Sequence, residues 1–212
     1  MPDAGSTTKP PVGGSATGSG CSDKIEMENM IADFEDGTNG ILPVGGRGAG
    51  FYVYDDGSGK QMAAPSGPMG GACASMYSYR SVGAGYSKWG AGIGTDLVAG
   101  AMKQSFNASA YSGIRFMARA GSAVMVRFKA QDKNTIPEGG VCKPGGCNNN
   151  FGKIVSVGTD WKSYTVLFKD MTQEDWGDIF PAFEKDKIYG LQFQFAKGVD
   201  FDLSIDNVAF VK

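Results

Sequence analysis

The sequence predicts an all-β protein, an antiparallel β-sandwich, from three observations. Apolar and polar residues alternate with a period of two in many short segments. The chain contains 33 Gly and 9 Pro, and charged residues make up only 20% of it, which disfavours long surface helices. Its 13 Phe, 8 Tyr and 3 Trp supply a sizeable core, and 212 residues suit one domain.

The candidate strands follow one another along the chain, separated by glycine-rich turns. Within the later strands, alternate apolar residues are expected to face the core, and the residues between them to face outward. Thr172 and Asp175 have the spacing of a capping box, so one helical turn is expected at 172–176. The candidate strands are 30–34, 51–54, 74–80, 90–96, 113–120, 123–130, 164–168, 191–195 and 201–206.

Residues 1–27 are predicted to be a flexible linker that precedes a single domain at 28–212. Most of the first twenty residues are Gly, Pro, Ser, Thr or Ala, a composition typical of tethers. Such a tether suits a module attached to a larger chain or, as in a lipoprotein, to a membrane anchor. No segment approaches 18 consecutive apolar residues, so no transmembrane segment is expected.

Two features of the composition exclude whole classes of function. The chain has no histidine, which excludes Ser-His-Asp and Cys-His catalysis and histidine zinc sites. With 20 Lys and Arg against 22 Asp and Glu, the net charge is −2 and no basic block stands out, so no nucleic-acid partner is expected. The glycine-rich segments 45–50 and 90–94 lack the Lys-Ser ending of a phosphate-binding loop.

The four cysteines are expected to form two disulfides, Cys142–Cys147 and Cys21–Cys73. Cys142 and Cys147 enclose only four residues, a spacing compatible with a small ring, which leaves Cys21 and Cys73 to pair. Four cysteines permit three connectivities, and this is one of them. Disulfides indicate an oxidising compartment, so a secreted or cell-surface location is expected.

Acidic residues gather near both ends of the folded part. Asp33, Glu35 and Asp36 lie beside a predicted turn, and Asp206 lies in the last candidate strand. If the terminal strands pair, these carboxylates and loop carbonyls could supply the roughly six to eight oxygen ligands of a calcium ion. The alternative is that they are solvated acids in turns.

Five segments occur in a fixed order along the chain: IADFEDG (31–37), WGAGIGTDL (89–97), FNASAYSGIRFMAR (106–119), WKSYTVLF (161–168) and IDNVAF (205–210). They resemble bacterial carbohydrate-binding-module domains with the galactose-binding-like β-sandwich, a jelly roll, and are also similar to the complex I intermediate-associated protein group. The resemblance covers roughly residues 28–212. It implies a structural calcium ion, with Glu35 and Asp206 as its main ligands and Asp36 as a further one.

The resemblance also implies a sugar site on a sheet face or at one edge of the sandwich, where aromatic rings are flanked by planar polar groups. Arg and Gln side chains present paired hydrogen-bonding groups to vicinal hydroxyls, and two arginines on neighbouring strands would also suit an acidic sugar. The alternative for each residue is an ordinary solvated sheet face, or burial for Trp89. The candidate ligand-binding residues are Arg115, Arg127, Gln192, Gln194, Asp202, Tyr52, Tyr54, Trp89 and Trp176.

The loop 132–151 is the most polar insertion in the domain, and the ring at Cys142 and Cys147 would stiffen it. Ordered loops of this length usually serve a purpose. Asn134 and the run 148–150 could contact a ligand; alternatively, the loop covers a sheet edge.

The expected function is non-catalytic binding of a polysaccharide by a module of an exported or surface-attached bacterial protein. One alternative is a surface or adhesive structural domain without a sugar site. A second is a jelly-roll glycoside hydrolase or polysaccharide lyase, for which hydrolysis needs two carboxylates across a cleft. No catalytic residue is predicted, because the acids expected to lie close together are assigned to calcium.

Overall fold

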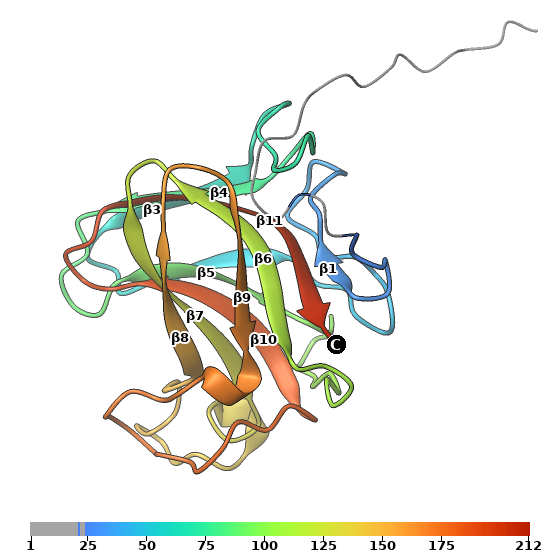
Figure 1. Ribbon diagram of the computed structural model, residues 1–212. Coiled ribbons are helices and arrows are strands. Elements are labelled where there is room, and N and C mark those ends of the chain that lie inside the picture. The colour runs from blue at the N-terminus through green and yellow to red at the C-terminus, as the bar shows by residue number, and fades with distance from the viewer. Residues whose placement is uncertain (1–20, 22–23) are drawn as a thin grey trace, which may run out of the picture.

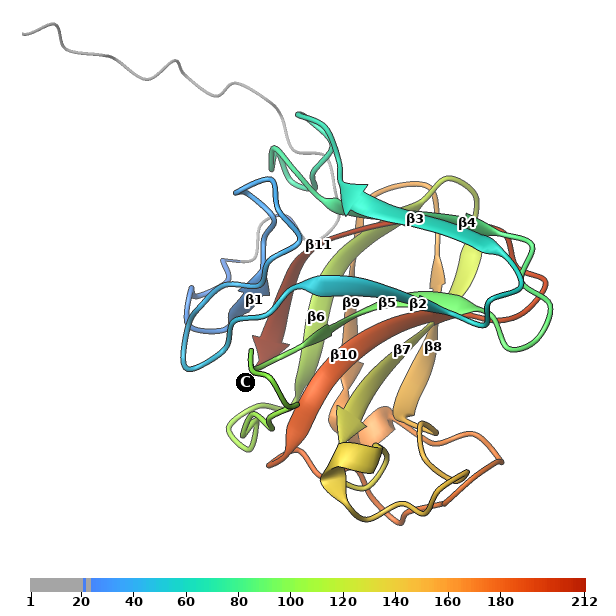
Figure 2. The same cartoon turned by 180° about the vertical axis from the view of Figure 1, so that it is seen from behind.

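The structure is a computed structural model that describes residue 21 and residues 24–212, which form two antiparallel β-sheets packed face to face (Figure 1). Sheet I contains, in spatial order, β3 (Lys60–Pro65), β4 (Tyr79–Ala84), β11 (Phe201–Val211), β6 (Gly113–Ala120) and β9 (Lys162–Leu167), and β1 (Met30–Ala32) also pairs with β11. Sheet II, seen in front in Figure 2, contains β2 (Phe51–Asp55), β5 (Ala91–Asp96), β10 (Ile188–Phe195), β7 (Val124–Asp132) and β8 (Phe151–Val157). The helical elements of the described residues are two 3-10 turns, η1 (Pro137–Gly139) and η2 (Phe168–Asp170).

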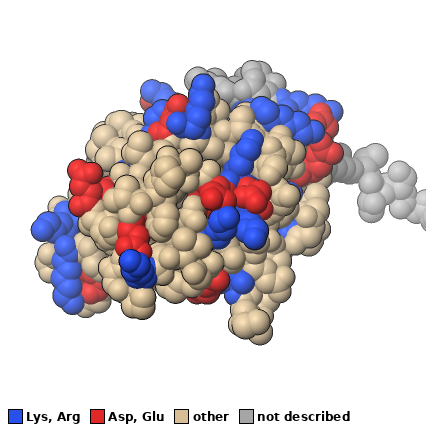
Figure 3. Space-filling model, turned by 90° about the horizontal axis from the view of Figure 1, so that it is seen from below, with Lys and Arg blue, Asp and Glu red and all other residues tan. Residues whose placement is uncertain are grey.

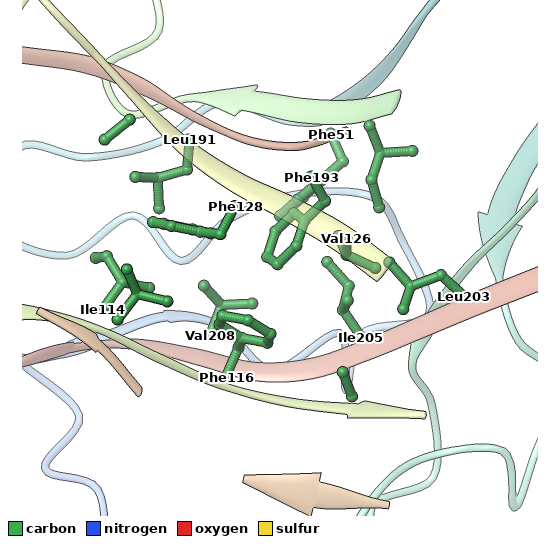
Figure 4. Packing of buried hydrophobic residues seen from close by; sticks show 14 of the residues in the cluster. Phe51, Ile114, Phe116, Val126, Phe128, Leu191, Phe193, Leu203, Ile205 and Val208 are labelled. Atoms are coloured by element: carbon green, nitrogen blue, oxygen red, sulfur yellow. The ribbon is translucent and has the colours of Figure 1, made fainter. Parts of the chain in front are cut away.

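The core lies between the sheets and follows the predicted alternation. Phe116 of sheet I faces Phe128 and Phe193 of sheet II, with ring centroids 5.7 and 4.9 Å away (Figure 4). All three side chains are at most 1% exposed. Each buried side chain of this kind contributes roughly 1.5–3 kcal/mol. Because the alternate residues of these strands are committed to the core, the pleat fixes the direction of the residues between them.

The two ends of the domain meet, as the calcium hypothesis required. β1 pairs antiparallel with β11, with Met30 opposite Ala209 and Ala32 opposite Val208. Asp206 and the turn that follows β1 therefore lie at the same end of sheet I.

Two details of the predicted secondary structure are wrong. No helical turn forms at 172–176, because the backbone of Thr172 pairs with Gly152 through two hydrogen bonds of 2.9 and 3.0 Å, which requires extended chain. The strand expected from residue 74 begins only at Tyr79, since 72–77 is a loop whose backbone binds Glu35 and Asp206. Strands β3 and β8 were not predicted.

Both predicted disulfides are present, Cys21–Cys73 and Cys142–Cys147. Most of the linker predicted at 1–27 lies outside the described residues. Within the described part of the chain, no helix is long and apolar enough to cross a membrane.

Candidate functional site

A cleft of about 1090 Å³ lies over the outward face of sheet II. Strand register arranges this face in two rows that cross the sheet. One row runs from Tyr52 through Gly94 and Gln192 to Lys129, and the other from Tyr54 through Gly92 and Gln194 to Arg127. The cleft is lined by six of the residues predicted from sequence, Tyr52, Tyr54, Trp89, Trp176, Gln192 and Gln194.

Aromatic rings form one side of the cleft. Gly92 and Gly94 lack side chains, so the rings of Tyr54 and Tyr52 lie across β5; a Cβ on Gly92 would come within 2.5 Å of the Tyr54 hydroxyl. Trp89 stacks on Tyr54 with ring centroids 6.1 Å apart and planes 19° apart, and remains 46% exposed. Together these rings form a platform whose outer surface, on Trp89, is open to a ligand.

The platform depends on Asp56, a residue that the sequence analysis did not single out. Its Oδ2 accepts hydrogen bonds from the backbone N–H groups of Lys88, Trp89 and Gly90, each at 2.9 Å. Burial disfavours the charged form of Asp56 and by itself would raise its pKa. Hydrogen bonds from Ser58, Gly90 and Trp89 outweigh this effect and hold the pKa below the usual value. Asp56 thus fixes the backbone from which Trp89 extends over Tyr54.

Polar side chains from β10, β7 and the end of the 132–151 loop form the floor. Lys129 Nζ donates to Gln194 Oε1 at 2.7 Å, and Asn150 Nδ2 donates to Gln192 Oε1 at 3.0 Å. Lys129 is only 4% exposed, and this burial lowers its pKa to about 8. Alternation along β7 puts Lys129 on the same face as Arg127, although Lys129 is not among the site residues predicted from the sequence.

Arg127 lies beside the floor and is tied to the segment that follows η2. Its Nη2 donates to the Thr172 carbonyl at 2.6 Å, and its Nε lies 3.8 Å from Glu174 Oε2. Arg127 and Gln194 are direct cross-strand neighbours. The guanidinium holds the 172–174 segment against β7, and Glu174 itself lines the cleft.

The loop 132–151 forms the wall opposite the aromatic platform, together with 173–180. Asn149 clamps the two segments: its Nδ2 donates to the Glu174 carbonyl at 2.6 Å, and its Oδ1 accepts from the Glu174 N–H at 3.0 Å. Asp178 Oδ2 accepts from the Lys143 N–H at 2.6 Å, which holds the disulfide ring in place. Of the loop asparagines, Asn148 and Asn150 line the cleft, whereas Asn134 is buried beside Glu184.

Two of the predicted site residues, Arg115 and Asp202, lie on the other sheet. Asp202, on β11, pairs with Arg80 at 2.7 Å, and Arg115, on β6, borders a separate pocket of about 130 Å³ near Met30 and Asn207. Both face outward as expected, but from sheet I. The expectation that they share a surface with Arg127 and Gln194 is wrong, because alternation shows that a residue faces outward and not which sheet carries it.

The carboxylates predicted to bind calcium converge on the loop 72–77. Asp206 Oδ2 accepts from the Ala72 N–H at 2.8 Å, and Glu35 Oε1 accepts from the N–H groups of Met76 and Tyr77 at 3.0 and 3.2 Å. Burial raises the pKa of Asp206 to about 7, and the charge of Glu35 adds to the rise.

Asp36 does not join this pair, since its carboxylate is exposed and binds the Thr38 N–H at 2.9 Å. The described residues contain no group of three or more His, Cys, Asp or Glu side chains suited to a metal. Other oxygen atoms do gather here: a Cβ on Gly71 would collide with the Ser75 hydroxyl and with the carbonyl oxygens of Ser75 and Tyr77. Two carboxylates and these oxygens fit the hard-ligand chemistry of calcium.

Charges on the face shown in Figure 3 are mixed, with basic and acidic side chains in small neighbouring groups.

No family model matches the chain, and no curated protein sequence does so either. Among solved structures, it is similar to the family 11 carbohydrate-binding module from Clostridium thermocellum in complex with a β-1,3-1,4-mixed-linked tetrasaccharide (TM-score 0.57, 16% identity, covering 86% of this chain and 94% of that one). It is also similar to the family 30 module of a cellulosomal cellulase from the same organism (TM-score 0.53, 12% identity, 76% and 91% covered).

A third similar structure is an exo-β-agarase (TM-score 0.53, 11% identity). The match covers 86% of this chain and 25% of the agarase chain. At these identities the similarity concerns the fold. It confirms the predicted resemblance: the chain has the β-sandwich fold of carbohydrate-binding modules. The two disulfides and this fold are typical of extracellular domains.

Proposed function

We propose that this chain is a non-catalytic polysaccharide-binding module and that its ligand lies in the cleft over sheet II. One observation carries the proposal: the rings of Tyr52, Tyr54, Trp89 and Trp176 and the polar floor of Gln192, Gln194 and Asn150 line one open cleft. Aromatic faces pack against the apolar faces of sugar rings, and amide groups bind their hydroxyls. Binding of a tetrasaccharide by the similar family 11 module supports the same use of the fold.

The carboxylates of the cleft favour binding over hydrolysis. Its two acidic side chains are Asp55 and Glu174. Asp55 Oδ1 accepts from the Gly57 N–H at 2.8 Å, while Glu174 lies against Arg127 and accepts from the Trp176 indole N–H at 3.4 Å. Each therefore has a structural partner of its own, which favours a structural role for both over the paired acid and base that hydrolysis needs. Incubation with a polysaccharide that binds is expected to release no reducing ends and no unsaturated products.

We expect Gln194→Ala to weaken polysaccharide binding by about 1–3 kcal/mol, the usual cost of removing one partner of a desolvated hydrogen bond. Arg127→Ala should have a comparable effect, through loss of the Thr172 contact that holds the cleft wall. Isothermal titration with a polysaccharide that the unmodified protein binds measures both losses.

Asp202→Ala is the matched control, since this residue faces outward from sheet I. The affinity of Asp202→Ala for the polysaccharide should stay within twofold of that of the unmodified protein. Unchanged binding in the Arg127→Ala, Gln194→Ala double variant would place the ligand away from the sheet face, with the 132–151 loop the first alternative.

We extend the proposal to a calcium ion that is held by Glu35 and Asp206 and has a structural role. Its support is the buried Asp206 carboxyl beside a second acid, whose charges a cation would compensate. An export signal or anchor attached through the N-terminal segment belongs to the same proposal and is supported by the two disulfides.

Calcium is expected to raise the melting temperature of the unmodified protein and a chelator to lower it. An ion present at 100 times its dissociation constant stabilises the native state by about 2.7 kcal/mol. This corresponds to roughly 5–10 °C in a domain of this size. The response should disappear in Asp206→Asn and persist in Asp36→Asn, and identical melting curves of the unmodified protein in calcium and in chelator would contradict the site.

A further inference from the structure

The floor of the cleft carries a buried positive charge that no residue in the described part of the chain neutralises. Lys129 is 4% exposed, and its ammonium donates to an uncharged acceptor, Gln194 Oε1, at 2.7 Å. Lys129 forms no salt bridge with any residue that the structure describes. Removing an ammonium from water without an opposite charge is costly, and a buried charge normally has a partner.

The acids nearby do not supply that partner. The charge of Glu174 acts on Lys129, but Glu174 lies against Arg127 Nε at 3.8 Å, and its side chain is 45% exposed. Asp55, the other acid of the cleft, is on β2, three strands away from β7 in sheet II. At the usual spacing between strands this separation is about 14 Å. Two cations of β7 thus share one half-exposed carboxylate.

Gly152 on β8 provides the room in which these two cations lie. It is the cross-strand neighbour of Lys129, and a Cβ there would lie 3.0 Å from Lys129 Cγ and 3.3 Å from Arg127 Nε. The side chain of Lys129 therefore lies over the sheet face, in the floor of the cleft.

A second observation points to a ligand at the same place. Asn150 is 1% exposed and donates through Nδ2 to Gln192, but its Oδ1 is buried with no hydrogen-bond partner among the described residues. The buried Tyr54 hydroxyl also has no hydrogen-bond partner among the described residues. Buried polar atoms are almost always paired, so these two are available to the hydroxyls of a bound sugar.

We propose that the cleft takes an acidic polysaccharide, and that Lys129 binds the anionic group, a carboxylate or a sulfate ester, of one of its sugar units. The inference rests on the proposed function and specifies the ligand class for the same cleft. The anion would supply the missing opposite charge, while Asn150 Oδ1 and the Tyr54 hydroxyl bind neighbouring hydroxyls. A charge-assisted hydrogen bond of this kind is about twice as strong as one between neutral groups.

The experiment compares four polymers at constant ionic strength by isothermal titration. Polygalacturonate and a sulfated galactan carry the two kinds of anionic group, while carboxyl-reduced polygalacturonate and mixed-linked β-glucan are neutral. The unmodified protein is expected to bind at least one anionic polymer ten or more times tighter than either neutral one. Which of the two anionic polymers binds tighter distinguishes a carboxylate ligand from a sulfate.

Lys129→Met removes the charge and keeps the length of the side chain, and the melting temperature checks that it folds. We expect it to lower affinity for the anionic polymer at least tenfold. Lys153→Met is the matched control, because Lys153 lies on the neighbouring strand β8 and pairs with Asp170 at 3.1 Å; its affinity should stay within twofold.

Neutral polymers bound as tightly as anionic ones, or an unchanged affinity in Lys129→Met, would overturn the acidic ligand and leave the proposed function intact. Failure of all four polymers and of a wider glycan panel to bind would remove the proposed function, and this inference with it.

Discussion

Replacement of Trp89 by alanine is expected to weaken polysaccharide binding about 30-fold. The indole stacks on Tyr54 on one side and is 46% exposed on the other, so it offers a rigid apolar face to a sugar ring. Aromatic side chains at the centre of an interface commonly contribute about 2 kcal/mol or more, and 2 kcal/mol is roughly 30-fold in affinity. Isothermal titration or affinity electrophoresis measures the loss.

Trp161→Ala is the control for this variant. Trp161 precedes β9 of sheet I and lies under the Arg119 guanidinium, at 5.1 Å from the ring centroid, away from the cleft. Its removal should leave affinity unchanged. Asp56→Asn provides an indirect test of the same platform, because it weakens the hydrogen bonds that place the Trp89 backbone and should lower affinity less than Trp89→Ala does. If Trp89→Ala binds the polysaccharide as tightly as the unmodified protein and Trp161→Ala binds it more weakly, the aromatic platform is not the binding site.

Replacement of Cys21 and Cys73 by serine is expected to lower the free energy of unfolding by about 4 kcal/mol. The bridge joins residues 52 positions apart, and its removal restores the chain entropy of a long loop to the unfolded state. The Cys142–Cys147 ring spans 5 positions, for which the same relation gives about 2 kcal/mol. In a domain of this size the two losses correspond to roughly 8–16 °C and 4–8 °C in melting temperature.

Binding should respond in the opposite order. Cys142 and Cys147 line the cleft, so their double serine variant should lose affinity at temperatures where it is folded, whereas the Cys21→Ser, Cys73→Ser variant should keep it. Calorimetry and titration of both variants under the same conditions measure the two effects. Equal losses of stability from both pairs, or a larger loss from the short ring, would contradict the entropic argument.

The sequence predicted the fold and about half of the cleft because both depend on local periodicity. Alternation in 191–195 fixed Gln192 and Gln194 as outward residues, and the structure brings both to the cleft. The same argument failed for Arg115 and Asp202, whose strands belong to sheet I. Which sheet a strand joins depends on pairings between segments far apart in the chain, and no local pattern records those pairings.

The residues that the sequence analysis missed act through long-range contacts. Asp56 binds the backbone of 88–90, and Asn149 binds that of Glu174, across 25 positions of the chain. Lys129 was recognised as facing outward, but its importance comes from burial among the neighbouring strands, which the chain alone does not reveal. Glycine spacing offered a partial signal, since Gly92 and Gly94 alternate in β5 where the two tyrosine rings need space.

The most direct test of the central claim is the location of a bound polysaccharide fragment, measured by amide chemical-shift changes of the labelled protein during titration. The changes are expected to concentrate on sheet II and the cleft wall, at Gln192, Gln194, Asn150 and the backbone of Trp89. Arg115 and Asp202 on sheet I should show none. Changes confined to sheet I, or spread evenly over both sheets at saturating ligand, would contradict the assignment of the cleft as the binding site.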